Sequence, residues 1–186
     1  MDAWRLERVV GDAAALPYEE RVAALDEALG LWRGPAYADF ADEDWARGER
    51  SRLTELRLHA VERRAEALVE LGRAAEAVPD LDAHAAAHPR REDAWRLLAL
   101  ALYRTGRQGD ALAVLRRAKG LLVEQLGIDP GPGLRGLEED ILRQADRLDP
   151  AGARSGCGRG RRPPTTGRCG RGRGWSRRWG CCGTSR

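Results

Sequence analysis

Apolar residues recur at intervals of three and four along most of residues 1–148, a spacing that places them on one face of successive α-helices. No stretch shows the sustained alternation of β-branched residues that is typical of a strand, and the chain is rich in the helix formers Ala, Leu, Arg and Glu. Glycines and prolines divide the pattern into seven or eight segments. The sequence therefore predicts an all-α fold.

One pair of these segments occurs twice. Residues 61–81 are repeated as residues 95–115, an offset of 34 residues and the length of a tetratricopeptide unit of two antiparallel helices. Small Ala residues let the paired helices approach closely, larger apolar residues fill the groove, and a left-handed Gly ends the first helix. Because one pair cannot bury its own apolar face, we expect these positions to form the structural core of stacked pairs. The equivalent positions are Val61 and Trp95, Ala65 and Ala99, Leu68 and Leu102, Gly72 and Gly106, Ala77 and Ala111, and Leu81 and Leu115.

The first two expected helices form a degenerate pair, and the last resembles the cap that closes a repeat array. In this cap, Leu134, Leu137, Ile141 and Leu142 should face inward. Pro79 should kink its helix or mark the true start of that helix. The expected helices cover about residues 2–10, 17–32, 44–71, 74–88, 93–105, 108–126 and 132–148.

The loop after the second expected helix reads AYADFADED and carries Tyr37 and Phe40 among acidic residues. Apolar side chains in a polar loop usually anchor it, so we expect both rings to pin the loop to the core. Trp45 then opens the apolar stripe of the long third helix. The acidic residues in the first turn of that helix are favoured by its dipole.

Composition changes abruptly near residue 150. Residues 1–150 hold all 29 acidic and 22 of the 32 basic residues, a net charge of −7, whereas the remaining residues hold ten Arg and no acid. We therefore expect a helical-repeat domain over residues 1–148 and a disordered Arg/Gly-rich tail over residues 149–186. The tail's Gly, Arg, Pro, Cys and Trp share GC-rich codons, which indicates a frameshifted gene end. The alternative is a disordered segment that binds nucleic acid through charge and through stacking of Trp175 and Trp179.

The domain contains few residues that could bind a metal or a cofactor or take part in catalysis. His84 and His88, four residues apart, could be metal ligands on one helix face, but no third ligand is in register, so we expect a solvated or capping role and no metal. Catalytic and cofactor-binding motifs are absent, and we expect neither an enzyme nor a cofactor. The negative charge opposes nucleic-acid binding by the domain. A Cys-free domain without a signal peptide or an apolar run of ~20 residues predicts a cytoplasmic protein that does not contact the membrane.

Four stretches together carry a family resemblance. They are LWRGPAYADF (31–40), ERSRLTELRLHAVE (49–62), HPRRE (88–92) and ALYRTGRQGDALAVLRRAKGLLVEQLGIDPGPGLRGLEEDIL (101–142). Over about residues 1–145 the chain resembles the bacterial transcriptional activator domain of antibiotic-pathway regulators of the SARP/AfsR type. The most specific feature is YRTGRQGDAL followed by LGIDPGPGL, since general tetratricopeptide repeats would explain only the first of these.

The resemblance implies a helical domain that follows a winged-helix DNA-binding domain and supports dimerisation and transcription activation. Its partners would be neighbouring protomers, the winged-helix domain or RNA polymerase. This sequence starts at the helical domain, so we expect the winged helix to be lacking, which puts direct DNA binding by this chain in doubt. The alternatives are a stand-alone helical-repeat adaptor for a peptide or partner helix, and nucleic-acid binding through the Arg-rich tail.

Overall fold

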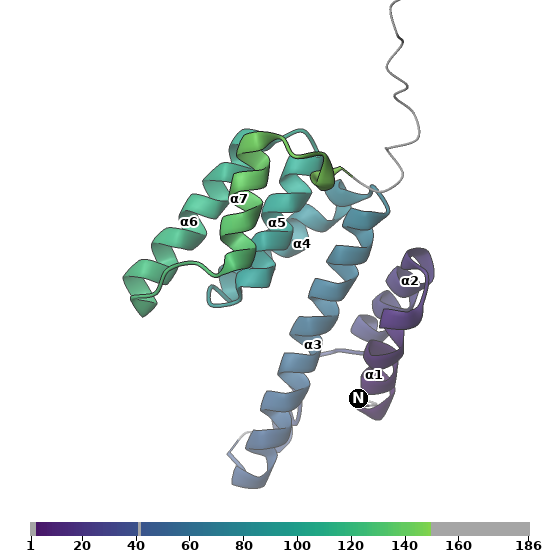
Figure 1. Cartoon of the computed structure of the whole chain (residues 1–186). Coiled ribbons are helices and arrows are strands. Elements are labelled where there is room, and N and C mark those ends of the chain that lie inside the picture. Colours follow the sequence, from purple (N-terminus) through teal and green to yellow (C-terminus); the bar gives the residue numbers. More distant parts are fainter. Residues whose placement is uncertain (1–2, 41, 150–186) are drawn as a thin grey trace, which may run out of the picture. The chain divides into compact units, whose positions relative to one another are not determined.

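The computed structural model describes residues 3–40 and 42–149, and within these residues it contains helices and no strand (Figure 1). The predicted all-α fold is thereby confirmed, whereas the predicted tail lies outside the described residues apart from Asp149. None of the described helices is long and apolar enough to cross a membrane. The α-helices are α1 (Ala3–Asp12), α2 (Tyr18–Gly30), α3 (Asp44–Glu70), α4 (Ala74–Ala87), α5 (Glu92–Arg104), α6 (Gln108–Leu126) and α7 (Pro132–Arg143), and the 3₁₀ turns are η1 (Ala13–Ala15), η2 (Ala38–Phe40) and η3 (Asp146–Leu148).

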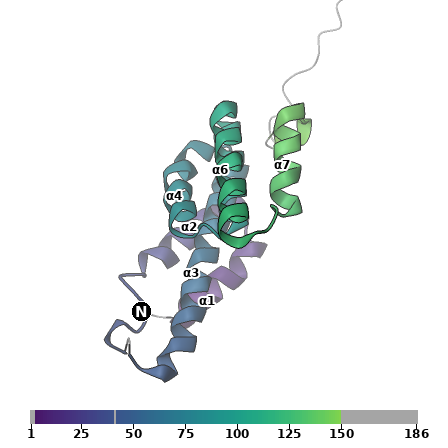
Figure 2. The ribbon, with the colours of Figure 1, turned by 90° about the vertical axis from the view of Figure 1, so that its left-hand side faces the viewer.

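Consecutive helices pack as antiparallel pairs. The most extensive contacts join α2 to α3, α4 to α5, and α5 to α6, while α7 packs on α5 and α6. The turned view shows α6 and α7 running alongside each other (Figure 2). This arrangement is the stacked-pair architecture of tetratricopeptide-like repeats.

Two glycines end the first helix of each repeated pair in the same way. Gly72 and Gly106 have φ angles of +76° and +80°, in the left-handed region that favours glycine. The amide of Arg73 then donates to the carbonyl of Leu68 at 2.8 Å, and the amide of Arg107 donates to the carbonyl of Leu102 at 2.9 Å. These bonds satisfy carbonyl groups that the helix end leaves unpaired and reverse the chain into the next helix.

The apolar repeat positions occupy the interior, with one exception, whereas Gly72 and Gly106 are exposed. Trp95 is the largest fully buried side chain, and its Nε1 donates to the carbonyl of Pro89 at 3.0 Å. Its equivalent, Val61, is only half-buried. The other apolar repeat positions are buried, and they are Ala65, Leu68, Ala77, Leu81, Ala99, Leu102, Ala111 and Leu115.

Among the described residues, most of the buried apolar side chains form two clusters. The larger spans the C-terminal half of α3, helices α4 to α7 and the η3 turn, and Val22 of α2 joins it. The smaller unites α1 and α2 with Ala60 of α3. Helix α3 therefore runs from one cluster to the other.

The prediction that Tyr37 and Phe40 anchor their loop to the core is wrong. Both side chains are exposed, and their rings contact Trp45 instead, Tyr37 edge-on with ring centroids 5.9 Å apart and Phe40 at a tilt with ring centroids 5.4 Å apart. Trp45 is itself 62% exposed, although it opens the predicted apolar stripe of α3. Among the described residues of this loop, Ala36 is the buried one. The three rings cover part of one another's apolar surface outside the core.

The cap ends earlier than predicted. Helix α7 stops at Arg143 because Gln144 adopts a left-handed conformation with φ +50°, and the η3 turn then inserts Leu148 into the core. Leu142, expected to face inward, is 62% exposed, whereas Leu134, Leu137 and Ile141 are buried as predicted. Leu148 supplies the fourth apolar contact that the sequence pattern assigned to Leu142.

Pro79 lies inside α4, whose first residue is Ala74, so it does not mark the start of that helix.

Candidate functional site

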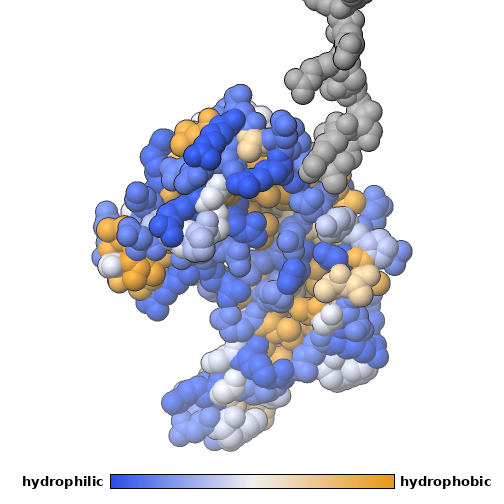
Figure 3. All heavy atoms as spheres, viewed as in Figure 1, coloured by the Kyte–Doolittle hydropathy of each residue, from blue (hydrophilic) through white to orange (hydrophobic). Residues whose placement is uncertain are grey.

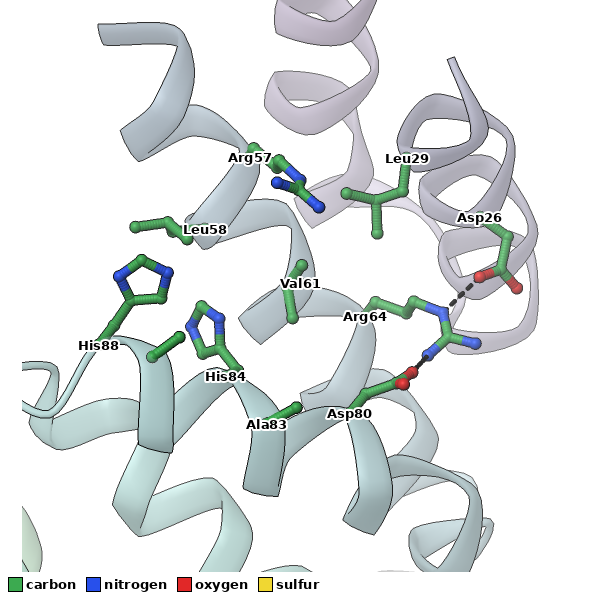
Figure 4. Close-up of a pocket in the computed structure, with 11 residues that line it drawn as sticks. Asp26, Leu29, Arg57, Leu58, Val61, Arg64, Asp80, Ala83, His84 and His88 are labelled. Carbon is green, nitrogen blue, oxygen red and sulfur yellow. Dashed lines mark hydrogen bonds and ion pairs between the residues drawn. The ribbon is translucent and has the colours of Figure 1, made fainter. Parts of the chain in front are cut away.

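A groove lies between α2, α3 and α4, and we call it the α2–α4 groove (Figure 4). Its volume is about 510 Å³, which falls within the range of ligand-binding clefts. Helix α3 forms the floor, and α2 and α4 form the two walls. The lining residues are Asp26, Leu29, Arg57, Leu58, Val61, Arg64, Asp80, Ala83, His84, Ala87 and His88.

The floor of the groove is apolar because helical spacing places Leu58 and Val61 of α3 opposite Ala83 and Ala87 of α4. Leu58 is 7% exposed and belongs to neither of the two core clusters. Ala36, Ala46 and Leu53 are likewise buried outside both clusters.

The repeat places a larger side chain at the equivalent position of the second unit. In the second unit, the position equivalent to Val61 carries Trp95, which is 1% exposed and lies beneath the guanidinium of Arg117 at 5.3 Å. The larger ring of Trp95 does not close the second unit, because a groove of about 430 Å³ lies at the equivalent place and is lined by Leu98, Val114 and Arg117, the equivalents of Arg64, Asp80 and Ala83.

Charged side chains stand at both ends of the groove. At one end Arg64 bridges two carboxylates: it pairs with Asp26 of α2, and its Nη1 lies 3.0 Å from Oδ2 of Asp80 of α4 (Figure 4). At the other end the guanidinium of Arg57 lies 5.3 Å from the ring centroid of Trp32. Within residues 3–40 and 42–149 no carboxylate pairs with Arg57. The two ends therefore differ in charge, with excess negative charge beside Arg64 and a free cation at Arg57.

A buried ionic network lies beside the groove. Glu62 and His84 are 6% and 8% exposed, and His84 Nε2 lies 3.2 Å from Oε1 of Glu62. Arg91, at the N-terminus of α5, donates from Nε and Nη2 to the two oxygens of Glu62 at 2.7 and 2.9 Å. Its Nη1 donates to Glu55 at 2.6 Å. The network ties α3, α4 and α5 together at one wall of the groove.

The charges of this network act on its carboxyl group. Burial by itself would raise the pKa of Glu62, but the hydrogen bonds from Arg91 and His84 outweigh burial and lower that pKa to about 2. Glu62 is therefore ionised in the folded protein at neutral pH. A buried carboxylate with this many donors is a structural anchor and not a proton donor.

His84 is not solvated, so that part of the sequence prediction is wrong. His88 does occupy the C-terminal cap of α4, and its ring centroid lies 5.2 Å from that of His84. Burial, together with the charges of His84 and Arg91, lowers the pKa of His88. Among the described residues, no three His, Cys, Asp or Glu side chains come together as metal ligands would.

Sequence reasoning missed Glu62 although a signal was present. Glu62 lies four residues after Leu58 and three before Ala65, on the inward stripe of α3. A carboxylate in that position needs a cationic partner. Arg91 lies 29 residues away, so the partner could not be identified by local spacing.

A second cleft of about 380 Å³ continues the first, and both share Leu58, Ala87 and His88. It adds the loop between α4 and α5, including Arg90, which is exposed.

A separate apolar patch lies at the C-terminal end of α6, where hydrophobic surface gathers in the space-filling view (Figure 3). The exposed apolar residues there are Val123, Leu126 and Ile128.

Comparison with known proteins yields consistent matches. The model of the bacterial transcriptional activator domain matches residues 1–142. The regulatory protein AfsR of Streptomyces griseus is 46% identical over 124 residues, which are 67% of this chain and 13% of AfsR. The transcriptional regulatory protein EmbR of Mycobacterium tuberculosis is 42% identical over 132 residues, which are 71% of this chain and 34% of EmbR.

A solved structure matches as well. It is that of Mycobacterium tuberculosis EmbR in complex with a low affinity phosphopeptide, with a TM-score of 0.71 and 40% sequence identity. The match covers 76% of this chain and 38% of that one. The chain thus spans about a third or less of the length of these relatives.

Proposed function

The chain belongs to the bacterial transcriptional activator domain family, and from this we propose that it is the non-catalytic regulatory module of a SARP-like transcriptional regulator. It would act through protein contacts that support transcription activation and self-association. Relatives that match over most of this chain are transcriptional regulators, which supports a regulatory role.

The observation that carries the proposal is the α2–α4 groove. Its floor on α3 is apolar, its walls are α2 and α4, the Glu62 network ties α4 to the floor helix, and its two ends carry opposite charge. A rigid concave surface of this kind is suited to a segment of another protein. The patch at the end of α6 supports self-association, because contiguous exposed apolar surface marks contact sites on proteins.

Fusion of the full chain to an unrelated sequence-specific DNA-binding domain tests the activating role. With the operator of that domain placed upstream of a bacterial promoter, we expect the fusion to raise reporter expression above that given by the DNA-binding domain alone. Equal expression, with operator occupancy shown by footprinting to be the same, would overturn the proposal.

Sedimentation equilibrium tests self-association. We expect the full chain to form a dimer and Leu126→Glu to shift it towards the monomer, because a charge is placed within the apolar patch. Leu142→Glu is the matched control, since Leu142 is also exposed and lies on α7, outside the patch. A monomeric chain, or an equal effect of both substitutions, would refute the role of the patch.

A further inference from the structure

We propose that the α2–α4 groove binds an extended peptide segment in which two apolar residues separate an acidic residue from a basic one. This inference rests on the proposed function, because it specifies the chemistry of the partner that the regulatory module would contact. Three features of the groove carry it: the apolar floor, the opposite charge of the two ends, and the distance between those ends.

The apolar floor supplies the affinity. Leu58, Val61 and Ala87 face space that neither core cluster fills, and Leu29 lines the wall opposite Ala87. Two apolar side chains of a partner would cover this surface and remove it from water, a gain of roughly 25 cal/mol for each Å² covered. The floor therefore selects for apolar residues in the middle of the bound segment.

Arg57 supplies the site for a carboxylate. Its guanidinium rests on the Trp32 ring, which limits its motion while the hydrogen-bonding edge stays available. No carboxylate in the described part of the chain pairs with it. Arg and Trp are also the residue types that most often dominate binding energy at protein interfaces.

The opposite end supplies the site for a cation. Arg64 carries one positive charge and faces two carboxylates, those of Asp26 and Asp80, so this end keeps one net negative charge. Both carboxylates are accessible, with side chains 49% and 61% exposed. A Lys or Arg of the partner can approach them without displacing Arg64.

The length of the groove sets the spacing of the partner's charges. The backbone positions of Arg57 and Arg64 are seven residues apart on α3, about 10.5 Å along the helix axis at a rise of about 1.5 Å per residue, and Arg64 holds Asp26 and Asp80 at its end. An extended peptide advances about 3.3 Å per residue, so a basic residue three positions from the acidic one spans about 10 Å. The fitting core is therefore Glu-Leu-Leu-Lys, with Asp or Arg as equivalents.

The test is an NMR titration of the isotope-labelled full chain with a blocked peptide of sequence Ser-Glu-Leu-Leu-Lys-Ser. We expect amide shifts to change at Val61, Ala83 and Ala87. Two control peptides carry Gln in place of Glu, or Ser in place of both Leu, and each should bind at least about tenfold more weakly because one class of contact is lost. Shifts confined to residues 150–186 would overturn the proposal, because binding would then belong to the basic segment.

Two pairs of protein variants locate the site. Arg57→Gln should weaken binding about tenfold, whereas Arg8→Gln, which removes a similar cation from the exposed ring of Trp4, should leave affinity unchanged. Ala87→Phe should block the groove, whereas Ala86→Phe adds the same ring to an exposed position of α4 outside the lining. Equal affinity within either pair would overturn the proposal, and backbone amide spectra verify that each variant is folded.

The reporter fusion separates this inference from the proposed function. If the fusion activates transcription while the peptide fails to bind in the groove, the inference is wrong and the regulatory role stands. If the peptide binds in the groove and the fusion does not activate, the regulatory role is wrong and the binding site stands.

Discussion

Glu62→Gln is the substitution that measures the contribution of the buried network to stability. Gln keeps the size of the side chain and removes its charge, so it resembles the protonated carboxyl group. Each tenfold change in proton affinity corresponds to about 1.4 kcal/mol. A pKa of about 2 instead of 4.5 therefore means that ionisation of Glu62 stabilises the folded state by about 3 kcal/mol. This is a net effect: burial raises the pKa of Glu62, and the hydrogen bonds and charges of Arg91 and His84 lower it by more.

The same network predicts how that stability depends on pH. Because the pKa of Glu62 is lowered in the folded state, the contribution is complete above about pH 4.5 and is lost as the pH falls towards 2. The stability difference between the native protein and Glu62→Gln should therefore shrink over this interval. The lowered pKa of His88 also favours unfolding below pH 6.5, but His88 is present in both proteins and cancels in the difference.

Urea unfolding followed by far-ultraviolet circular dichroism, at several pH values between 7 and 3, gives the required free energies. Glu76→Gln is the control, because Glu76 pairs with Arg73 at the surface and water screens that pair. We expect little change for Glu76→Gln at any of these pH values. A Glu62→Gln protein as stable as the native one at pH 7, or a difference that stays constant down to pH 3, would refute the reasoning.

Three further substitutions test the fold, each by urea unfolding. Leu102→Ala should cost roughly 2–5 kcal/mol, because Leu102 is buried in the larger core and its loss leaves a cavity. Gly106→Ala should cost about 1 kcal/mol, since a Cβ at φ +80° meets no neighbouring atom and only the left-handed backbone is penalised. Leu142→Ala should change stability by less than about 0.5 kcal/mol, as an exposed position allows; a loss comparable to that of Leu102→Ala would place Leu142 in the core.

The helices could be predicted because apolar periodicity and helix-ending residues are local signals. Helix α6 begins and ends at the expected residues, and the glycines that end α3 and α5 were identified from the repeat. Periodicity does not reveal what faces an apolar residue, which is why Leu142 was assigned to the core and Trp45 to an inward stripe. An exposed cluster of aromatic rings has the same sequence pattern as an anchored loop.

The candidate site was only partly predictable. The repeat drew attention to Val61 but assigned it to the core, because its equivalent position holds Trp95. Whether a repeat position is core or surface depends on the volume of the side chain and on the neighbouring pair of helices, and the offset of 34 residues specifies neither. Glu62 and Arg91 were missed for a related reason, since a buried charge is explained only by a partner that folding brings to it.

Val61 makes recognition and stability compete for the same space. A larger apolar side chain there would occupy part of the groove and cover more of the apolar floor beside Leu58. The same change would leave less room for a partner. Selection for a more stable protein at this one position would therefore narrow the groove, and a member of the family that carries a bulky residue here should gain thermal stability and lose part of this contact surface.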